Sequence, residues 1–189
     1  VYGPADASAS LRAEVRDQTG AQVSGLAGTF SQQLDGNSLG LAWSEGGSYT
    51  AGLDLTTVAS GTHVLHVALS GGPVAAVSFS VDRSRPASSL SSLATVNNAP
   101  ITVTIAGNDD LSGVDLYRVQ YRTGASGAWT DWLTQTAGWS YTAGDVANLV
   151  LTFGLTHPVT LKDNTTYCFR VQAVDRAGNA ETAHANADS

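Results

Sequence analysis

The sequence predicts an all-β chain built from two β-sandwiches in tandem, and three observations support this fold class. The length of 189 residues exceeds that of one sandwich and suits two domains of about 100 residues each. Short segments with apolar residues at alternate positions recur along the chain, as expected for strands with one buried face. Twenty glycines, with many Asn, Asp and Ser residues, supply turns between these segments.

The first half, residues 1–82, contains about seven short strand signals. Apolar residues alternate in Leu11–Val15, Phe30–Leu34, Leu39–Leu41, Tyr49–Leu55, His63–Leu69 and Val77–Val81. Between the second and third of these segments, Asp35-Gly36-Asn37 is a strong turn signal. In the last segment we expect Val77, Phe79 and Val81 to face inward.

The junction between the halves is expected at Val81–Pro86, because Pro86 fixes its own φ and biases Arg85 toward extended geometry. This places the domains at residues 1–82 and 83–189. Further strand signals follow in Ile101–Ile105, Val114–Arg122, Trp129–Leu133 and Tyr167–Asp175. In the last of these, alternation predicts that Tyr167, Phe169, Val171 and Ala173 face the core, with Cys168, Arg170 and Gln172 on the outer face.

Each half resembles a known family of bacterial sandwich domains. In the first half, Asp17 to Gly20, Gly47–Leu55 and Ser60–Val67 resemble a bacterial Ig-like domain. In the second, Asp110–Val114, Tyr117–Arg122, Trp129–Trp132 and Tyr167–Asn179 resemble a bacterial fibronectin type III domain.

The second resemblance implies that Tyr167 is a tyrosine corner, the tyrosine whose hydroxyl bonds to the backbone just upstream in such sandwiches. The chain departs from the family in two places. Ile105 stands near the usual tryptophan of the second strand, and Trp139–Asp163 is longer than the common form, so we expect an extra hairpin or extended loop there.

Composition excludes some function classes. A net charge of -7 with only nine Lys and Arg argues against nucleic-acid binding, which needs clustered basic residues. No apolar run is long enough to span a bilayer, so no membrane insertion is expected within these residues. The absence of methionine and the start at Val1 suggest a piece of a longer polypeptide. The single Cys168 allows no intrachain disulfide and is expected to be an inert thiol.

The sequence predicts no enzyme. His63 and His66 have opposite parity on one strand and cannot share a metal from one face, while His157 and His184 lie in a loop and in the tail. None of the common nucleophile, zinc, phosphate-loop or dinucleotide motifs occurs.

Two groups of residues are candidate binding sites. In the fibronectin type III fold the loop with Asp109 and Asp110 lies at the same end as the turn with Asp175 and Asn179, so calcium is the one cofactor suggested. The alternative is that these are turn residues that bond to their own backbone.

The tryptophans Trp129, Trp132 and Trp139 form the second group, because exposed tryptophan stacks on sugar rings. The alternative is ordinary packing against the sandwich. Edge strands that pair with another chain are a third option, which nothing in the sequence selects.

These patterns favour a non-catalytic structural or accessory module, either spacer or adhesive, of a larger bacterial protein. The family resemblance implies an extracellular or cell-surface location. The expected partners are other domains of the same polypeptide and protein or polysaccharide at the cell surface. The alternative is a carbohydrate- or protein-binding module that uses the tryptophans or the 139–163 extension.

Overall fold

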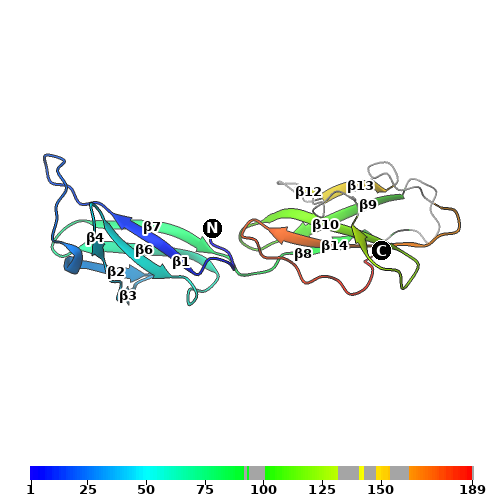
Figure 1. The fold of residues 1–189 in the computed structure, drawn as a ribbon, viewed down its shortest axis with the longest axis horizontal. Helices are drawn as coiled ribbons and strands as arrows, with labels where there is room; N and C mark the ends of the chain where they lie inside the picture. Colours follow the sequence, from blue (N-terminus) through cyan, green and yellow to red (C-terminus); the bar gives the residue numbers. More distant parts are fainter. Residues whose placement is uncertain (92, 94–100, 132–140, 143–147, 154–161, 189) are drawn as a thin grey trace. The chain divides into compact units, whose positions relative to one another are not determined.

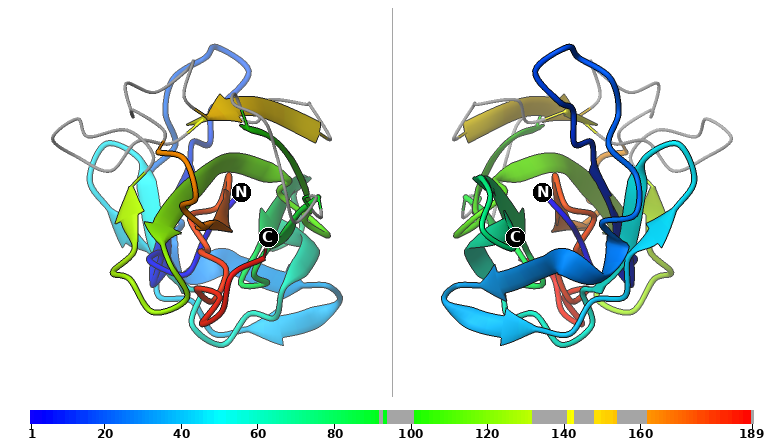
Figure 2. Two further views of the ribbon diagram at one scale, coloured as in Figure 1. Left: turned by 90° about the vertical axis from the view of Figure 1, so that its right-hand side faces the viewer. Right: turned by 90° about the vertical axis from the view of Figure 1, so that its left-hand side faces the viewer.

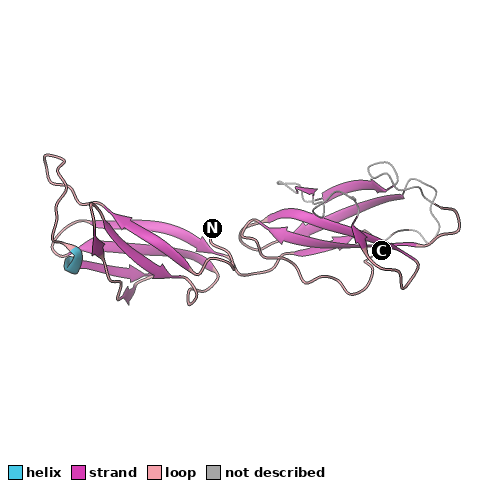
Figure 3. Ribbon diagram, in the orientation of Figure 1, coloured by secondary structure: helices cyan, strands magenta, loops and turns pink. Residues whose placement is uncertain are grey.

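The computed structural model describes residues 1–91, 93, 101–131, 141–142, 148–153 and 162–188. The chain divides into two compact units, unit 1 (Val1–Arg83) and unit 2 (Ser84–Ser189), so the division falls one residue after the predicted boundary. Regular structure in the described ranges is β apart from one short 3-10 helix, η1 (Ala27–Thr29) (Figures 1 and 3). Within those ranges no helix is long and apolar enough to cross a membrane.

Unit 1 consists of two antiparallel sheets. One has the order β1-β5-β4, formed by β1 (Ser8–Ala13), β5 (Tyr49–Asp54) and β4 (Ser44–Glu45). The other has the order β3-β2-β6-β7, formed by β3 (Asn37–Leu39), β2 (Phe30–Leu34), β6 (Gly61–Leu69) and β7 (Val74–Val81). Figure 2 draws these strands, coloured blue to green, in two further views.

Side chains from both sheets fill the interior of unit 1, which makes the unit a sandwich. The buried cluster consists of Ala9, Leu53, Leu55, Val58 and Val81, with Tyr2, Leu11, Leu34, Leu39, Leu41 and Phe79 packed against it. Tyr49 is fully buried, and its hydroxyl donates to the Val23 carbonyl at 2.7 Å and accepts from the Leu26 amide at 3.1 Å. The polar tip of this aromatic core residue is therefore satisfied by backbone.

Val77 lies opposite the buried Leu65 of β6, on the predicted face, but it is not buried there. Val77 is 52% exposed, whereas Val81, of the same parity, is fully buried and Phe79 packs against the core cluster. β7 is the outermost strand of its sheet, and Tyr2 bridges it only at Val81. Alternation predicts which side of a sheet a residue faces, but not how far the opposing layer extends.

Unit 2 also has two antiparallel sheets. One has the order β13-β9-β8, formed by β13 (Asn148–Phe153), β9 (Ile101–Asn108) and β8 (Ala87–Leu90). In the other, β10 (Val114–Thr123) pairs with β14 (Tyr167–Asp175) and also with β11 (Thr130–Asp131) and β12 (Tyr141–Thr142). Strands β12 and β13 fall within the predicted 139–163 extension, most of which lies outside the described residues. The all-β prediction of two successive β-sandwiches is confirmed.

The alternation predicted for β14 is confirmed. Phe169, Val171 and Ala173 are at most 1% exposed, and Val171 and Ala173 lie opposite the buried Val119 and Tyr117 of β10. Tyr167 is half-buried, and its hydroxyl accepts a hydrogen bond from the Lys162 amide at 3.1 Å. This bond to the backbone just upstream is the geometry expected of a tyrosine corner.

The contact between Gly107 of β9 and Tyr117 of β10 supports a prediction about stability. A Cβ at Gly107 would lie 2.6 Å from the Tyr117 hydroxyl oxygen and 2.7 Å from its ring, and Tyr117 is fully buried. Gly107→Ala should therefore lower the free energy of unfolding of unit 2 by about 1–3 kcal/mol, the usual cost of overpacking. Urea denaturation followed by tyrosine and tryptophan fluorescence would measure this change.

The matched control is Gly52→Ala, because Gly52 is also a strand glycine but has no atom within 4 Å of the added Cβ. Equal losses in the two variants would contradict the close approach between the sheets of unit 2.

Candidate functional site

The segment after β14 turns back along the outer edge of that strand; we call residues 180–188 the C-terminal strap. Ala180 forms an isolated bridge with Val174. Farther along, the Glu181 amide donates to the Ala173 carbonyl at 2.9 Å and the Asp188 amide donates to the Phe169 carbonyl at 2.8 Å. The strap therefore occupies the position of a last strand without forming a regular ladder.

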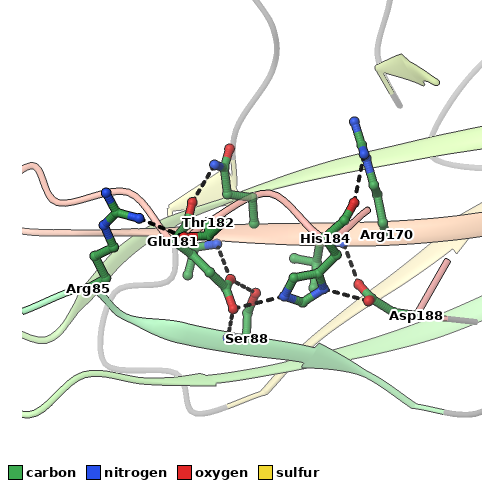
Figure 4. Close-up of polar contacts among 10 residues, drawn as sticks. Arg85, Ser88, Arg170, Glu181, Thr182, His184 and Asp188 are labelled. Atoms are coloured by element: carbon green, nitrogen blue, oxygen red, sulfur yellow. Dashed lines mark hydrogen bonds and ion pairs between the residues drawn. The ribbon is translucent and has the colours of Figure 1, made fainter. Parts of the chain in front are cut away.

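Carboxylates of the strap accept hydrogen bonds from the edge of β14. The Ala173 amide donates to Glu181 Oε2 at 3.0 Å, and the Val171 amide donates to Asp188 Oδ2 at 2.8 Å. Glu181 also accepts from the Ser88 amide at 2.8 Å and from the Ser88 hydroxyl, both on β8. One glutamate thus connects strands from both sheets of unit 2 (Figure 4).

His184 lies between the two acids of the strap (Figure 4). Its Nδ1 is 2.5 Å from Asp188 Oδ1 and its Nε2 is 3.0 Å from Glu181 Oε1. Burial alone would lower the pKa of His184, but hydrogen bonds and charge attraction from Asp188 and Glu181 outweigh it, so the pKa is raised. Both ring nitrogens face acceptors, which matches the doubly protonated imidazolium.

Other side chains hold the backbone of the strap. Arg170 Nη1 donates to the His184 carbonyl at 2.8 Å, and Gln172 Nε2 donates to the Glu181 carbonyl at 2.6 Å. Arg85 Nη1 donates to the Thr182 hydroxyl at 2.6 Å. The strap is therefore fixed by side-chain bonds from β14 and from the segment that precedes β8.

Unit 1 contains a second histidine with both ring nitrogens engaged. His63 Nδ1 is 2.6 Å from Asp35 Oδ2, and its Nε2 is 2.9 Å from the Ala59 carbonyl. The hydrogen bond to Asp35 is the main reason why the pKa of His63 is raised. Asp35 has a positive φ of 51° in the predicted turn between β2 and β3, and it also accepts from the Val64 amide at 2.8 Å. The sequence predicted this turn but not its contact with β6.

Neither histidine offers a free nitrogen to act as a general base. The Ser88 hydroxyl donates to Glu181 rather than to His184, so serine, histidine and acid lie together without the order that activates a nucleophile. In the described part of the chain these groups satisfy backbone amides and one another.

Asp109 and Asp175, two of the predicted calcium ligands, both act as turn residues. Asp109 Oδ2 accepts from the amides of Ser112 at 2.9 Å and Gly113 at 2.8 Å. Asp175 accepts from the backbone amide of Asn179 at 2.8 Å and from its side-chain amide at 2.7 Å. The turn interpretation offered by the sequence therefore describes these bonds correctly.

The structure also brings two of these acids together. Asp109 and Asp175 offer carboxylate oxygens within 4.8 Å of one another, and Asp175 is only 2% exposed. Asp109 Oδ1 is inaccessible to solvent and has no hydrogen-bond partner among the described residues. Asp110 is exposed on the same loop, and Asn179 is buried against Asp175. Two close carboxylates repel each other, and a bound cation would remove that repulsion.

Trp129 is covered by cations of its own unit. The guanidinium carbon of Arg122 lies 4.5 Å from the centroid of the indole ring and that of Arg170 lies 4.4 Å from it. Trp129 is half-buried. Trp132 and Trp139 lie outside the described residues, so their predicted role in sugar binding stays a prediction.

The calcium site stays a prediction that one substitution tests. Millimolar calcium should raise the Tm of unit 2 in the wild type, because the ion would bind the native acid pair and not the unfolded chain. Asp109→Asn should abolish that increase while it keeps an oxygen acceptor for the loop amides. Asp17→Asn is the matched control, since Asp17 caps an exposed turn of unit 1 in the same way. An unchanged wild-type Tm on calcium addition would contradict the site.

The imidazolium of His184 should make the stability of unit 2 depend on pH. Its pKa is raised in the folded state above the ordinary 6.5, so the stabilisation is fully present below pH 6.5 and is lost as the pH rises through the folded pKa. The Tm difference between wild type and His184→Gln should therefore be larger at about pH 5.5 than at about pH 9. Differential scanning calorimetry measures this difference. His66→Gln, at an exposed position on β6, is the control. A pH-independent difference for His184→Gln would contradict the charged contact of His184 with Glu181 and Asp188.

No protein-family profile and no curated protein sequence matches the chain. Among solved structures, it is similar to the fibronectin(III)-like modules of CbhA from Clostridium thermocellum, with 14% identity over 97% of this chain and 84% of that one and a TM-score of 0.37. It is also similar to SGBP-B of the Bacteroides ovatus mixed-linkage glucan utilization locus, solved with a heptasaccharide, with 14% identity over 95% of this chain and 38% of that one and a TM-score of 0.30. The third is dimeric latent PorU from Porphyromonas gingivalis, with 15% identity over 97% of this chain and 18% of that one and a TM-score of 0.32.

Proposed function

We propose that this chain is a non-catalytic accessory module, a spacer or adhesive part of a larger extracellular bacterial protein. The observation that carries the proposal is that the two described histidines with acidic neighbours are engaged in hydrogen bonds within the fold. His184, His63 and the acids around them bond to backbone and to each other, and each histidine has both ring nitrogens engaged. A histidine that acts as a catalytic base needs a free ring nitrogen within reach of a substrate proton.

The organisation of the chain supports a spacer. Units 1 and 2 each have two sheets and a buried interior, and unit 1 passes directly into unit 2 at Arg83 and Ser84. Self-contained units in tandem extend a polypeptide without a long flexible linker. The partners of such a module are the neighbouring domains of the same polypeptide.

The second candidate is a binding module for carbohydrate or protein. The observation in its favour is the cationic group around Trp129 on the outer face of β10 and β14. Trp132, Trp139 and the 139–163 extension belong to the same hypothesis as predictions from sequence.

The absence of catalysis is tested with the intact 189-residue chain and panels of peptide, ester and glycoside substrates. We expect no turnover above a heat-denatured sample over many hours. Turnover that disappears in His184→Gln or His63→Gln would overturn the proposal. Turnover that survives both substitutions would overturn it as well, and would place the chemistry elsewhere in the chain.

The extracellular location is tested separately on intact cells that produce the parent protein. External protease should remove the epitope of an antibody raised against the chain, while a cytoplasmic marker protein stays intact. Protection of the epitope until the cells are lysed would contradict the surface location.

A further inference from the structure

We propose that the outer face of β10 and β14 binds a carboxylated polysaccharide through Arg122 and Arg170. This site specifies a ligand class for the binding-module alternative and rests on that alternative. The spacer role does not depend on it, so the two can fail separately.

Strand pairing places the two arginines together. In the antiparallel pair, Gln120 lies opposite Arg170 and Arg122 lies opposite Cys168. Because side chains alternate across a strand, Gln120, Arg122 and Arg170 share the face opposite the buried Val119 and Phe169. The two guanidiniums therefore project from neighbouring positions on one sheet face.

Both guanidiniums contact one aromatic ring, at 4.5 Å for Arg122 and 4.4 Å for Arg170 from the Trp129 centroid. Attraction to the indole offsets part of the repulsion between the two cations. Their proximity still has an electrostatic effect: burial and then the charge of Arg122 lower the pKa of Arg170. Two like charges held this close form a local electrostatic site for an anion.

Arg122 has capacity to bind such an anion. Its Nε is inaccessible to solvent and has no acceptor within the described part of the chain. Arg170, by contrast, donates from Nε to Gln120 at 2.7 Å and from Nη1 to the His184 carbonyl at 2.8 Å. Because Nε is inaccessible, an external carboxylate would have to meet the two Nη groups of Arg122, which form the outer fork of the guanidinium.

The acids nearest this face are engaged elsewhere. Asp131 accepts from Gln120 Nε2 at 2.9 Å. Asp188 attracts Arg170, but its two oxygens bond to His184 and to the Val171 amide. Neither of these two described acids therefore neutralises the positive charge of Arg122.

The surroundings favour a sugar acid over an acidic peptide. Gln120 and Gln172 lie on the same face, and the indole of Trp129 stands beside the cations. Each glutamine donates one Nε2 hydrogen within the fold, to Asp131 and to the Glu181 carbonyl, so the second hydrogen of each amide is the one that would pair with a sugar hydroxyl. A uronic acid residue combines a carboxylate, which fits a guanidinium, with adjacent hydroxyls, which fit amides. A polymer of such residues would contact both arginines along the sheet.

The test is affinity electrophoresis of the intact chain in gels with polygalacturonate, a neutral β-glucan or poly-L-glutamate at low salt. We expect polygalacturonate to retard the wild type and the other two polymers to leave its mobility unchanged. Arg122→Gln and Arg170→Gln should each weaken the binding about tenfold, the effect of losing one charge-assisted contact. Arg122→Lys, which keeps the charge but not the fork, should weaken it as well.

Arg12→Gln is the matched control, because it removes one positive charge from an exposed arginine of unit 1. An equal loss in this variant would show an effect of net charge and would overturn the site. Absence of wild-type binding, or equal retardation by poly-L-glutamate, would also overturn it. Thermal melts of every variant separate lost binding from lost folding, and the lysine variant replaces Arg122→Gln if the latter unfolds.

Discussion

Unit 2 depends on how the outer edge of β14 finds acceptors for its backbone amides. One edge of this strand pairs with β10, and a buried amide on the other edge is costly unless it too is hydrogen-bonded. Carboxylates of Glu181 and Asp188 supply those acceptors in place of the carbonyls of a full strand. Because two acids then lie side by side, His184 between them becomes the counter-charge that holds the arrangement.

The same requirement divides the polar residues of unit 2 between two tasks. The acids and the histidine at the β14 edge form hydrogen bonds to backbone amides and to one another. On the outer face of β10 and β14, Arg122 and Arg170 gather positive charge around Trp129 in a chain whose net charge is negative. If this face binds the proposed ligand, structure and recognition use neighbouring surfaces of one strand, and Arg170 contributes to the structural part through its bond to the His184 carbonyl.

The parts of the fold that could be predicted from sequence are those with a local signal. Alternation in β14 placed Phe169 and Val171 in the core, because burial on one face of a strand repeats every second residue. The strap had no such signal, because its sequence has no apolar residues at regular spacing. It is held instead by acidic side chains that accept hydrogen bonds from backbone amides. The only clue in the sequence was the spacing, with His184 three residues after Glu181 and four before Asp188. No helix or strand was predicted for this segment, so nothing indicated that the three side chains would meet.

The strap also changes how the module would respond to force. A terminal strand in a regular ladder resists a lengthwise pull through many backbone bonds that shear together. In unit 2 a pull on the C-terminal end would load the bonds of Asp188 to β14 and to His184 first, and then those of Glu181 to β14 and β8. Since the imidazolium binds both acids, the mechanical strength of this end would follow the acidity of the medium. In the proposed spacer role, the resistance of this end to pulling would therefore depend on whether His184 is protonated.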